Sequence, residues 1–347
     1  MHPIVAEDIR RIIDSNIPWS QLNGATVLIA GANGFLPAYI IETLLHLNDR
    51  MRSGIRIIGV ARSLPKALAR FKNYAGRHDL DFVESDVTKL ETIENRTIDY
   101  IIHAASQASP KYYGVDPVGT LSANVTGTER LLNMARAHQV KGFLFFSSSE
   151  IYGQLTAGQI PVKENEMGTL DPMDVRACYA ESKRMGETMC VSWSHQYGIP
   201  VKIVRPFHTY GPGMALDDGR VFADFVSNIV RNHDIVMRSE GTATRSFCYL
   251  ADATAGFFKV LLEGKNGEAY NVGNAACEIS IMQLAQLLVG LYPEKKLSVK
   301  KDFSVLQNYI PSAVQRIVPD TAKIQKLGWL PIIGLEEGFK RTIETYL

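Results

Sequence analysis

The sequence has little of what marks a secreted, membrane-bound or metal-binding protein. Its 347 residues include only four cysteines, which are widely spaced and form no CxxC or cysteine–histidine pattern. We therefore expect reduced thiols and no metal site. No apolar run approaches the roughly 18 residues of a membrane span, and the amino terminus mixes charged with apolar residues, unlike a signal peptide. These absences predict a cytoplasmic protein with no membrane partner.

The sequence also lacks an excess of charge of either sign. Lysine and arginine number 37 and aspartate and glutamate 36, which gives a formal net charge of +1. Such a balance creates no overall field that would attract a polyanion, so we expect no nucleic-acid partner. A small anionic ligand held by a few local basic groups remains compatible with it. The length and the 46% of hydrophobic residues fit one large globular domain or two joined ones.

Apolar strands alternate with helical segments over the first two thirds of the chain. The apolar runs predict strands at 26–31, 55–61, 81–86, 99–105, 141–149 and 201–207. Helical spacing predicts helices at 34–47, 64–75, 117–139 and 177–197. This alternation indicates an α/β fold with a doubly wound parallel sheet of the Rossmann type, covered by helices on both faces. The last third, with helices near 280–291 and 335–346, predicts a smaller mixed α/β lobe.

A glycine turn follows the first predicted strand. Gly31, Asn33, Gly34 and Phe35 lie where that strand gives way to a helix. Such a turn lets the backbone approach a pyrophosphate, and the N–H groups of the helix start meet its charge. The position at the head of a strand–helix series is the setting that a dinucleotide site requires. Pro37 replaces the third glycine of the pattern, which should loosen the contact between helix and strand.

The ends of the next strands bear on the choice of dinucleotide. Arg62 stands where a carboxylate would normally bind the adenosine ribose. A carboxylate repels a 2′-phosphate and an arginine can pair with one, so NADP is a serious option beside NAD. The alternative is that Arg62 is a solvated surface residue. Asp86 and Val87 are predicted to contact the adenine, and Ala104 and Ala105 to lie along the cofactor.

Tyr179 and Lys183 are four residues apart in a predicted helix and so face the same side. A tyrosine with a pKa of about 10 is a poor base at neutral pH. A nearby ammonium, together with a positive nicotinamide, would favour the phenolate. The YxxxK spacing is common by chance. Its place after a glycine turn, with a serine-rich strand end at 147–150 in between, is what favours a catalytic pair.

Five segments in this order carry a family resemblance: GANGF, HAAS, SSSEIYG, YAESK and RPFHTYGPG. Together they resemble the extended short-chain dehydrogenase/reductase family that modifies nucleotide sugars. Residues 108–128, 176–190 and 244–252 most resemble UDP-glucuronate decarboxylases. The resemblance implies a Rossmann domain that carries NAD or NADP, a smaller domain that binds a nucleotide sugar, a homodimer formed through a four-helix bundle, and a place in polysaccharide biosynthesis.

The resemblance also implies a division of the chain. Residues 1–23 would form a helical extension packed on the domain, and residues 24–207 the NAD(P)-binding domain. Residues 208–347 would mainly form the nucleotide-sugar-binding domain. A segment near 245–262 would return to the Rossmann domain.

The family's residue roles can be placed on matching positions. Tyr179 would deprotonate the sugar C4 hydroxyl while hydride leaves C4, and Ser148 would bind the same oxygen. Lys183 would hold the nicotinamide ribose and lower the pKa of Tyr179. The implied cofactor contacts are Gly31, Asn33, Gly34, Phe35, Arg62, Asp86, Val87, Ala104, Ala105, Tyr179, Lys183 and Pro206. The implied substrate contacts are Ser109, Ser149, His208 and Arg245.

A ketone at C4 allows three outcomes: decarboxylation of a uronate, 4,6-dehydration or 4-epimerisation. Similar 4,6-dehydratases have Thr-Asp-Glu where this chain has Ser148-Ser149-Glu150. A serine cannot replace a carboxylic acid as proton donor at neutral pH, and Glu150, a catalytic candidate, remains. We therefore favour decarboxylation of UDP-glucuronate or a similar nucleotide uronate. A 4-epimerase comes next and a 4,6-dehydratase after it. A non-catalytic, cofactor-sensing protein is disfavoured because Ser148, Tyr179 and Lys183 are all present.

Two departures leave the substrate's nucleotide and sugar open. His208 replaces the family's phosphate-facing asparagine, and Gly213 replaces an arginine frequent in the decarboxylases. His208 would either donate to a diphosphate or be a buried histidine. Arg245 matches an arginine near the sugar and could receive a carboxylate or phosphate, or else form a structural pair between the lobes.

Overall fold

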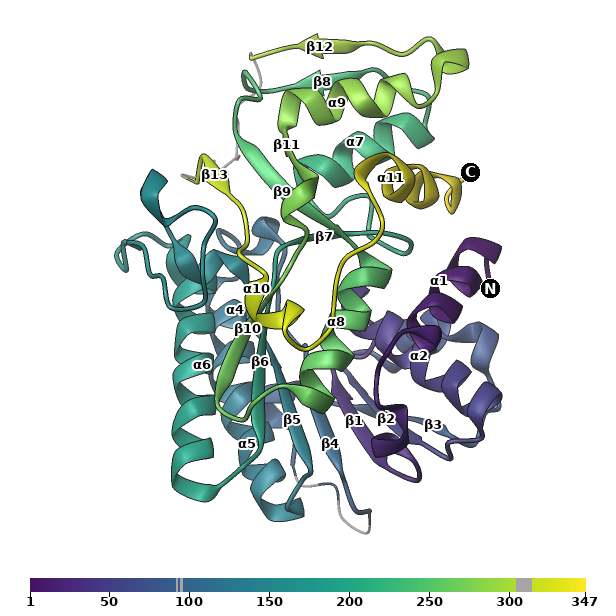
Figure 1. Cartoon of the computed structure of the whole chain (residues 1–347), viewed down its shortest axis with the longest axis vertical. Helices are drawn as coiled ribbons and strands as arrows, with labels where there is room; N and C mark the ends of the chain where they lie inside the picture. Colours follow the sequence, from purple (N-terminus) through teal and green to yellow (C-terminus); the bar gives the residue numbers. More distant parts are fainter. Residues whose placement is uncertain (92, 94–95, 304–313) are drawn as a thin grey trace.

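A seven-stranded parallel sheet forms the centre of the computed structural model, which describes residues 1–91, 93, 96–303 and 314–347. Its strands are β1 (Thr26–Ala30), β2 (Arg56–Ala61), β3 (Leu80–Glu84), β4 (Tyr100–His103), β5 (Gly142–Phe146), β6 (Val201–Pro206) and β10 (Glu268–Val272). They lie in the order β10-β6-β5-β4-β1-β2-β3, and each neighbouring pair is parallel (Figure 1). The order reverses next to β1, which is the topology of a doubly wound Rossmann sheet and confirms the predicted fold class.

Both faces of the sheet are buried. Along β1, Val27 and Ile29 join one hydrophobic cluster, and Leu28 and Ala30 join the other. Successive side chains of a strand point to opposite faces, so a strand covered on both sides is apolar throughout. Helices α2 (Phe35–Met51) and α8 (Leu250–Glu263) cover one face, and α5 (Thr126–His138) and α6 (Ala177–Tyr197) the other (Figure 1).

Two of the predicted helices are shorter or divided. The stretch predicted at 64–75 forms α3 (Leu64–Arg70) and then a short 3-10 turn. The one predicted at 117–139 is broken at Val125 into α4 (Pro117–Asn124) and α5. Just after the break the backbone comes so close to Val87 that a Cβ on Gly127 would lie 2.7 Å from its side chain. Helical spacing in the sequence continues across the break and gives no sign of it.

The amino-terminal helix α1 (Pro3–Asp14) joins parts of the chain that are far apart in sequence. Its apolar side buries Ile9, Ile12 and Ile13. The buried carboxylate of Asp8 accepts hydrogen bonds from Tyr39 of α2 and Tyr249, at 2.8 and 2.7 Å, and pairs with Arg341 at 2.6 Å. Since Arg341 lies on α11 (Leu335–Glu344), the helix connects the central unit to the last helix, and the two lie near each other in Figure 1.

The smaller lobe is built mostly from residues after 207. Its sheet contains β7 (His208–Tyr210), β9 (Thr244–Tyr249), β11 (Glu278–Ser280) and β13 (Arg316–Ile317), and β8 (Ile235–Met237) pairs with β12 (Val299–Lys301). Helices α7 (Val221–Val230), α9 (Ile281–Gly290), α10 (Ala322–Gln325) and α11 complete this part of the chain. Within it, α8 returns to the central unit and β10 becomes the strand beside β6. The domain boundaries themselves stay a prediction.

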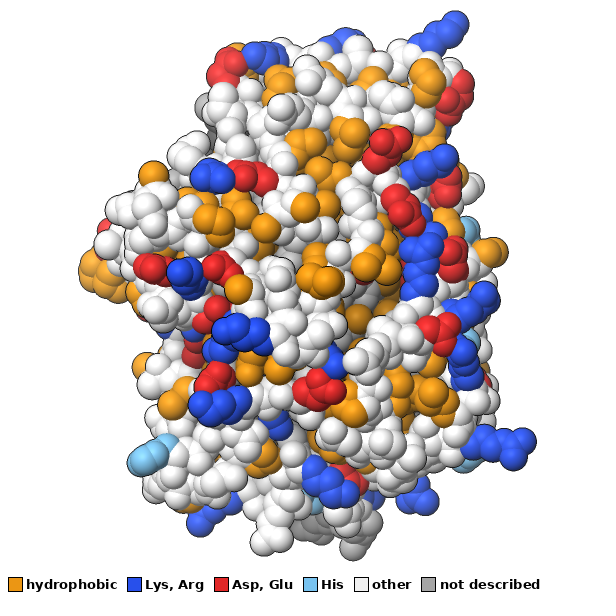
Figure 2. All heavy atoms as spheres, viewed as in Figure 1, with side chains coloured by type: hydrophobic (Ala, Val, Ile, Leu, Met, Phe, Trp, Pro, Cys, Tyr) orange, Lys and Arg blue, Asp and Glu red, His pale blue; other side chains and the backbone are white. Residues whose placement is uncertain are grey.

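The surface agrees with the balanced composition. Figure 2 shows lysine and arginine side chains interspersed with aspartate and glutamate over the face in view. All four cysteines are buried and free. Among the described residues, no helix is long and apolar enough to cross a membrane, and no group of three His, Cys, Asp or Glu side chains is placed to hold a metal ion.

Candidate active site

Two adjoining cavities lie at the carboxyl ends of the central strands, where ligands bind in doubly wound sheets. One, of about 400 Å³, follows the ends of β1, β2 and β3 and includes Arg62 and Asp86. The other, of about 220 Å³, follows β5 and β6 and includes Tyr179. Gly34, Ala104 and Ser106 line both. The two cavities are therefore continuous. We call the one at β1, β2 and β3 the cofactor groove, and the one at β5 and β6 the catalytic cavity.

The turn after β1 can hold a pyrophosphate. Gly31 has a φ of 82°, and a Cβ there would lie 2.8 Å from the Cα of Ala105, so only glycine fits. Gly34 caps the start of α2, whose first N–H groups have no partner within the helix. The buried hydroxyl of Ser106 has no hydrogen-bond partner in the described part of the chain, although it lies where the cavities meet. These features fit a dinucleotide whose phosphates cross this turn.

Arg62 lines the part of the cofactor groove that follows β2 and β3. Arg62 follows β2 and makes no hydrogen bond or ion pair with another described residue, while it lines the cofactor groove. The carboxylate of Asp86 instead accepts from the backbone and hydroxyl of Thr88 at 2.9 and 2.7 Å. Burial raises the pKa of Asp86, but the Thr88 hydrogen bonds and the charge of Arg62 outweigh it and leave that pKa lowered. The groove therefore presents an available guanidinium where a ribose-binding carboxylate would stand.

Tyr179 lies at the start of α6, buried in the catalytic cavity. Its hydroxyl shares a hydrogen bond with Ser148. Burial raises the pKa of Tyr179 to about 12; Ser148 and the charge of Arg220 lower this pKa, and Glu150 raises it. The ring stacks on Tyr113 with centroids 5.2 Å apart. The residue types needed to move a proton at one oxygen are therefore assembled around this hydroxyl.

Lys183 lies one turn further along α6. Its ammonium donates to the carbonyl of Phe146 at 2.6 Å and is 5.8 Å from the centre of the Tyr179 ring. Burial lowers the pKa of Lys183 to about 7. The cation that lowers the pKa of Tyr179 in the structure is Arg220. The effect of Lys183 on Tyr179 stays a prediction for the cofactor-bound enzyme.

Most of the predicted residues come together. All twelve predicted cofactor residues line the groove or the cavity, as do Ser148, Ser149, Glu150 and His208. Ser109 and Arg245 do not. The Ser109 hydroxyl donates to the carbonyl of Asp218. Arg245 donates to the carbonyls of Thr244 and Val314 at 2.7 and 2.8 Å.

Arg220 is the residue that sequence reasoning missed. It immediately precedes α7, pairs with Asp218, lies 5.1 Å from the ring of Phe222 and lines the catalytic cavity. The sequence around it, an Asp-Asp-Gly turn before an apolar helix, signals a helix start and nothing more. Its approach to Tyr179 comes from packing between segments about forty residues apart in sequence, which a local pattern does not contain.

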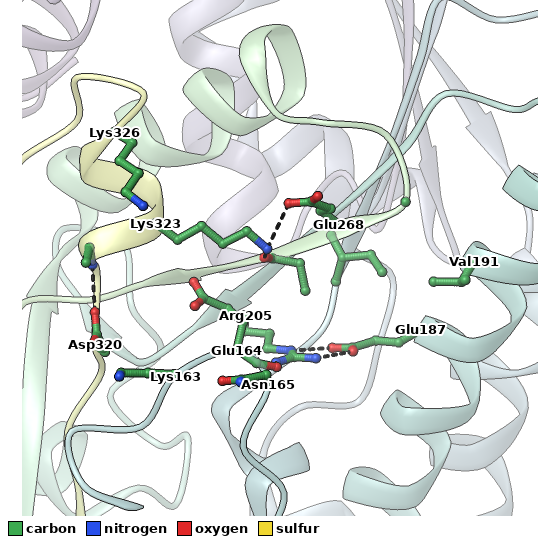
Figure 3. A pocket seen from close by; sticks show the side chains of 14 residues that line it. Lys163, Glu164, Asn165, Glu187, Val191, Arg205, Glu268, Asp320, Lys323 and Lys326 are labelled. Carbon is green, nitrogen blue, oxygen red and sulfur yellow. Dashed lines mark hydrogen bonds and ion pairs between the residues drawn. The ribbon is translucent and has the colours of Figure 1, made fainter.

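A third cavity, of about 510 Å³, contains none of the predicted residues. It lies beside β6, β10 and α6 (Figure 3). Arg205 pairs there with Glu187 at 2.6 Å, and Lys323 with Glu268 at 3.1 Å. Its central charges thus neutralise each other, which is typical of a structural ion-pair network.

The parallel sheet and the glycine turn are those of a Rossmann dinucleotide-binding fold, and a tyrosine, a lysine and a serine line the catalytic cavity beside them. Comparison with known proteins gives the family. Residues 27–273 match the model of the NAD dependent epimerase/dehydratase family, and the chain belongs to that family as one of its enzymes.

Named relatives are similar over nearly the whole chain. UDP-glucuronic acid decarboxylase 3 of Arabidopsis thaliana is 32% identical over 313 residues, which cover 90% of this chain and 86% of the relative. UDP-glucuronic acid decarboxylase 1 of Danio rerio is 31% identical, covering 94% of this chain and 74% of the relative. Among solved structures, UDP-glucuronic acid 4-epimerase from Bacillus cereus, in complex with UDP-glucuronic acid and NAD, has a TM-score of 0.78. It is 21% identical, covering 92% of this chain and 98% of that one, and thus supports the fold alone.

Proposed function

We propose that the protein oxidises a nucleotide sugar at C4 with a bound nicotinamide dinucleotide and decarboxylates UDP-glucuronate or a similar nucleotide uronate. The observation that carries this proposal is the composition of the catalytic cavity. The cavity is lined by the hydrogen-bonded pair Ser148 and Tyr179 and also by Glu150 and Arg220. Ser149 stands at the position where a dehydratase would need an acid. The similarity to UDP-glucuronic acid decarboxylases supports the same reaction.

Each side chain has a chemical task. The bound oxidised nicotinamide supplies a hydride acceptor for C4. Tyr179 takes the proton of the C4 hydroxyl, and Ser148 donates to the same oxygen. Because burial raises the pKa of Tyr179 to about 12, the reaction needs positive charge nearby, which Arg220 provides in part.

The resulting 4-keto uronate is a β-keto acid. Its C5–C6 bond breaks, carbon dioxide leaves, and the electron pair moves onto the C4 oxygen as an enolate. Ser148 and protonated Tyr179 stabilise that oxygen. A proton from solvent at C5 gives the 4-keto pentose. Reduction of that ketone, with hydride that the reduced dinucleotide would supply, gives the pentose when Tyr179 returns its proton to the C4 oxygen. Arg220 is our candidate for binding the carboxylate before the bond breaks, because it lines the catalytic cavity and Arg245 does not.

The direct test is to incubate the purified protein with UDP-glucuronate, follow carbon dioxide release and identify the sugar by NMR. We expect carbon dioxide and a UDP-pentose in equal amounts, and no gas from UDP-glucose, which has no carboxylate. Conversion to a 4-epimer without gas would replace the proposal by 4-epimerisation. A 4-keto-6-deoxy product from a nucleotide hexose would replace it by dehydration.

We further propose that Arg62 selects a dinucleotide with a 2′-phosphate. An arginine has only donors, so it cannot accept from the ribose hydroxyls as a carboxylate does, but it can pair with a phosphate. Calorimetric titration with NAD and NADP tests this without turnover. We expect NADP to bind more tightly, and Arg62→Asp to shift the ratio of dissociation constants toward NAD by about 10- to 100-fold. Arg56→Asp, at the other end of β2, is the matched control. Equal ratios in the wild type and Arg62→Asp would contradict the assignment.

We also propose a homodimer formed through α4 and α6. These helices pack against each other, and their outer side exposes apolar side chains, including Val118, Leu121 and Met185. Light scattering should give twice the chain mass, and the double variant Val118→Asp, Leu121→Asp should give a monomer. Ile332→Asp, on an exposed apolar residue elsewhere, should not. A monomeric wild type would refute the proposal. We likewise propose a cytoplasmic location and a role in polysaccharide biosynthesis.

A further inference from the structure

His208 occupies the point where the smaller lobe meets the catalytic cavity. It is the first residue of β7, and it pairs in register with Phe247 of β9, whose ring meets the imidazole edge-on at 5.8 Å. It lines the same cavity as Tyr179. Its Nδ1 atom is buried and has no hydrogen-bond partner in the part of the chain that the structure describes. A buried polar atom left without a partner is uncommon and indicates a missing ligand or water.

The charges around this imidazole are positive on the side of the smaller lobe. Burial, together with the charges of Arg245 of β9 and of Arg220 just before α7, holds the pKa of His208 well below its usual range. The other titratable groups that line the cavity are Glu150, Tyr179, Tyr113 and Lys183. The ring is therefore neutral at neutral pH, with one nitrogen that donates and one that accepts.

We propose that His208 binds an anionic group of the substrate and takes up a proton as that group arrives. This inference rests on the proposed function, because it takes the ligand to be a nucleotide sugar. A phosphate or carboxylate near the two arginines cancels part of their positive field and adds an opposite charge beside the ring. Both changes favour the imidazolium, which then donates from both nitrogens.

This behaviour depends on the residue type. An asparagine at the same place could donate one hydrogen bond to the anion but could not titrate. With histidine, binding becomes linked to pH with a definite sign. The free protein binds fewer protons than the complex, so affinity falls as pH rises between the pKa of His208 in the free protein and its higher value in the complex. In that window the dissociation constant rises by up to about tenfold per pH unit.

Isothermal titration calorimetry tests the linkage directly. UDP-glucose and UDP-glucuronate are titrated into the full-length protein between about pH 5 and pH 8, in buffers with different ionisation enthalpies. The diphosphate of a nucleotide sugar is fully charged over this range, so any proton taken up with UDP-glucose is bound by the protein. Because decarboxylation itself consumes a proton, UDP-glucuronate is titrated into the Tyr179→Phe background of each protein, which lacks the assigned base. UDP-glucose presents only the diphosphate, and UDP-glucuronate presents a carboxylate as well. Uptake with both ligands assigns the diphosphate to His208, and uptake with UDP-glucuronate alone assigns the carboxylate.

The wild type is expected to take up a substantial fraction of one proton per site, and His208→Asn and His208→Gln close to none. The dissociation constants of these variants should also be nearly independent of pH. His195→Asn, which removes an exposed histidine of α6, is the matched control and should keep the uptake. Melting curves of the two variants establish that they are folded.

Binding without proton uptake in the wild type would overturn the inference and leave the proposed function standing. So would uptake that persists unchanged in His208→Asn and His208→Gln. Failure of either nucleotide sugar to bind at any pH would instead count against the proposed function.

Discussion

The two walls of the catalytic cavity differ in how their residues are fixed. One wall, which we call the Rossmann wall, comes from the central unit: Ser148 and Glu150 follow β5, and Tyr179 lies near the start of α6. On the wall of the smaller lobe, Arg245 turns to backbone carbonyls, and Arg220 lies in the cavity instead. One wall follows from sheet topology, whereas the other depends on how separate segments pack.

The difference is also electrostatic. On the Rossmann wall, Lys183 donates to the carbonyl of Phe146, and burial lowers its pKa to about 7. On the wall of the smaller lobe, Arg220 pairs with the carboxylate of Asp218, and Arg245 donates to backbone carbonyls. We infer that the Rossmann wall carries the proton and hydride chemistry, while the smaller lobe recognises the substrate. Four experiments test this division of roles.

The largest effect is expected from Tyr179→Phe. It removes the hydroxyl that exchanges a proton with the C4 oxygen and keeps the ring that stacks on Tyr113. Turnover of UDP-glucuronate should fall by about 10²- to 10⁴-fold. Dinucleotide binding, measured by calorimetry, should change little. Full turnover in Tyr179→Phe would remove the assigned base, and Tyr112→Phe, on a half-exposed neighbour of the loop, serves as the matched control.

Arg220→Met should have the next largest effect. If Arg220 binds the carboxylate, its loss should lower kcat/KM for UDP-glucuronate by about 10- to 100-fold, the range of one charge-assisted hydrogen bond. Affinity for UDP-glucose, which lacks the carboxylate, should fall much less. Arg245→Met is the matched comparison and should mainly lower the melting temperature, because Arg245 bonds to backbone carbonyls. If Arg245→Met lowered kcat/KM for UDP-glucuronate and Arg220→Met did not, Arg245 would be the residue that binds the carboxylate, as the sequence predicted.

This contrast marks how far the sequence could predict the site. The glycine turn, Asp86 and Ala104 line the cofactor groove, as expected of residues at the carboxyl ends of parallel strands, which meet at one edge of a sheet. The strands and the alternation with helices followed from apolar runs and helical spacing, whereas the order of the strands was not predicted. Arg220 could not be found that way, since its neighbours in the cavity come from distant segments. The break at Val125 was missed because helical spacing is continuous across it.

Lys183 should make stability depend on pH. Its pKa is about 7 in the folded protein and about 10.4 in an unfolded chain, so between these values the unfolded state binds more protons. The free energy of unfolding contributed by this group therefore rises with pH above 7, by up to about 1.4 kcal/mol per pH unit. Lys183→Met lacks the group, so its stability relative to the wild type should fall from pH 7 to 9 in urea titrations. A difference independent of pH would show that the lysine is charged when buried. The exposed Lys72→Met is the control.

The smallest effect is expected from Ser109→Ala. The Ser109 hydroxyl donates to Asp218, and Lys111 nearby donates to the carbonyl of Asp217 at 3.1 Å, so this loop holds the turn that carries Arg220. Removing one neutral hydrogen bond costs about 1 kcal/mol, which should raise KM by less than about fivefold and leave kcat unchanged. Lys111→Ala should behave alike. A different result would be a fall in kcat/KM of more than about tenfold in Ser109→Ala but not in Lys111→Ala. Ser109 would then contact the substrate, as its position in the sequence suggests. The Rossmann wall would in that case share in substrate recognition.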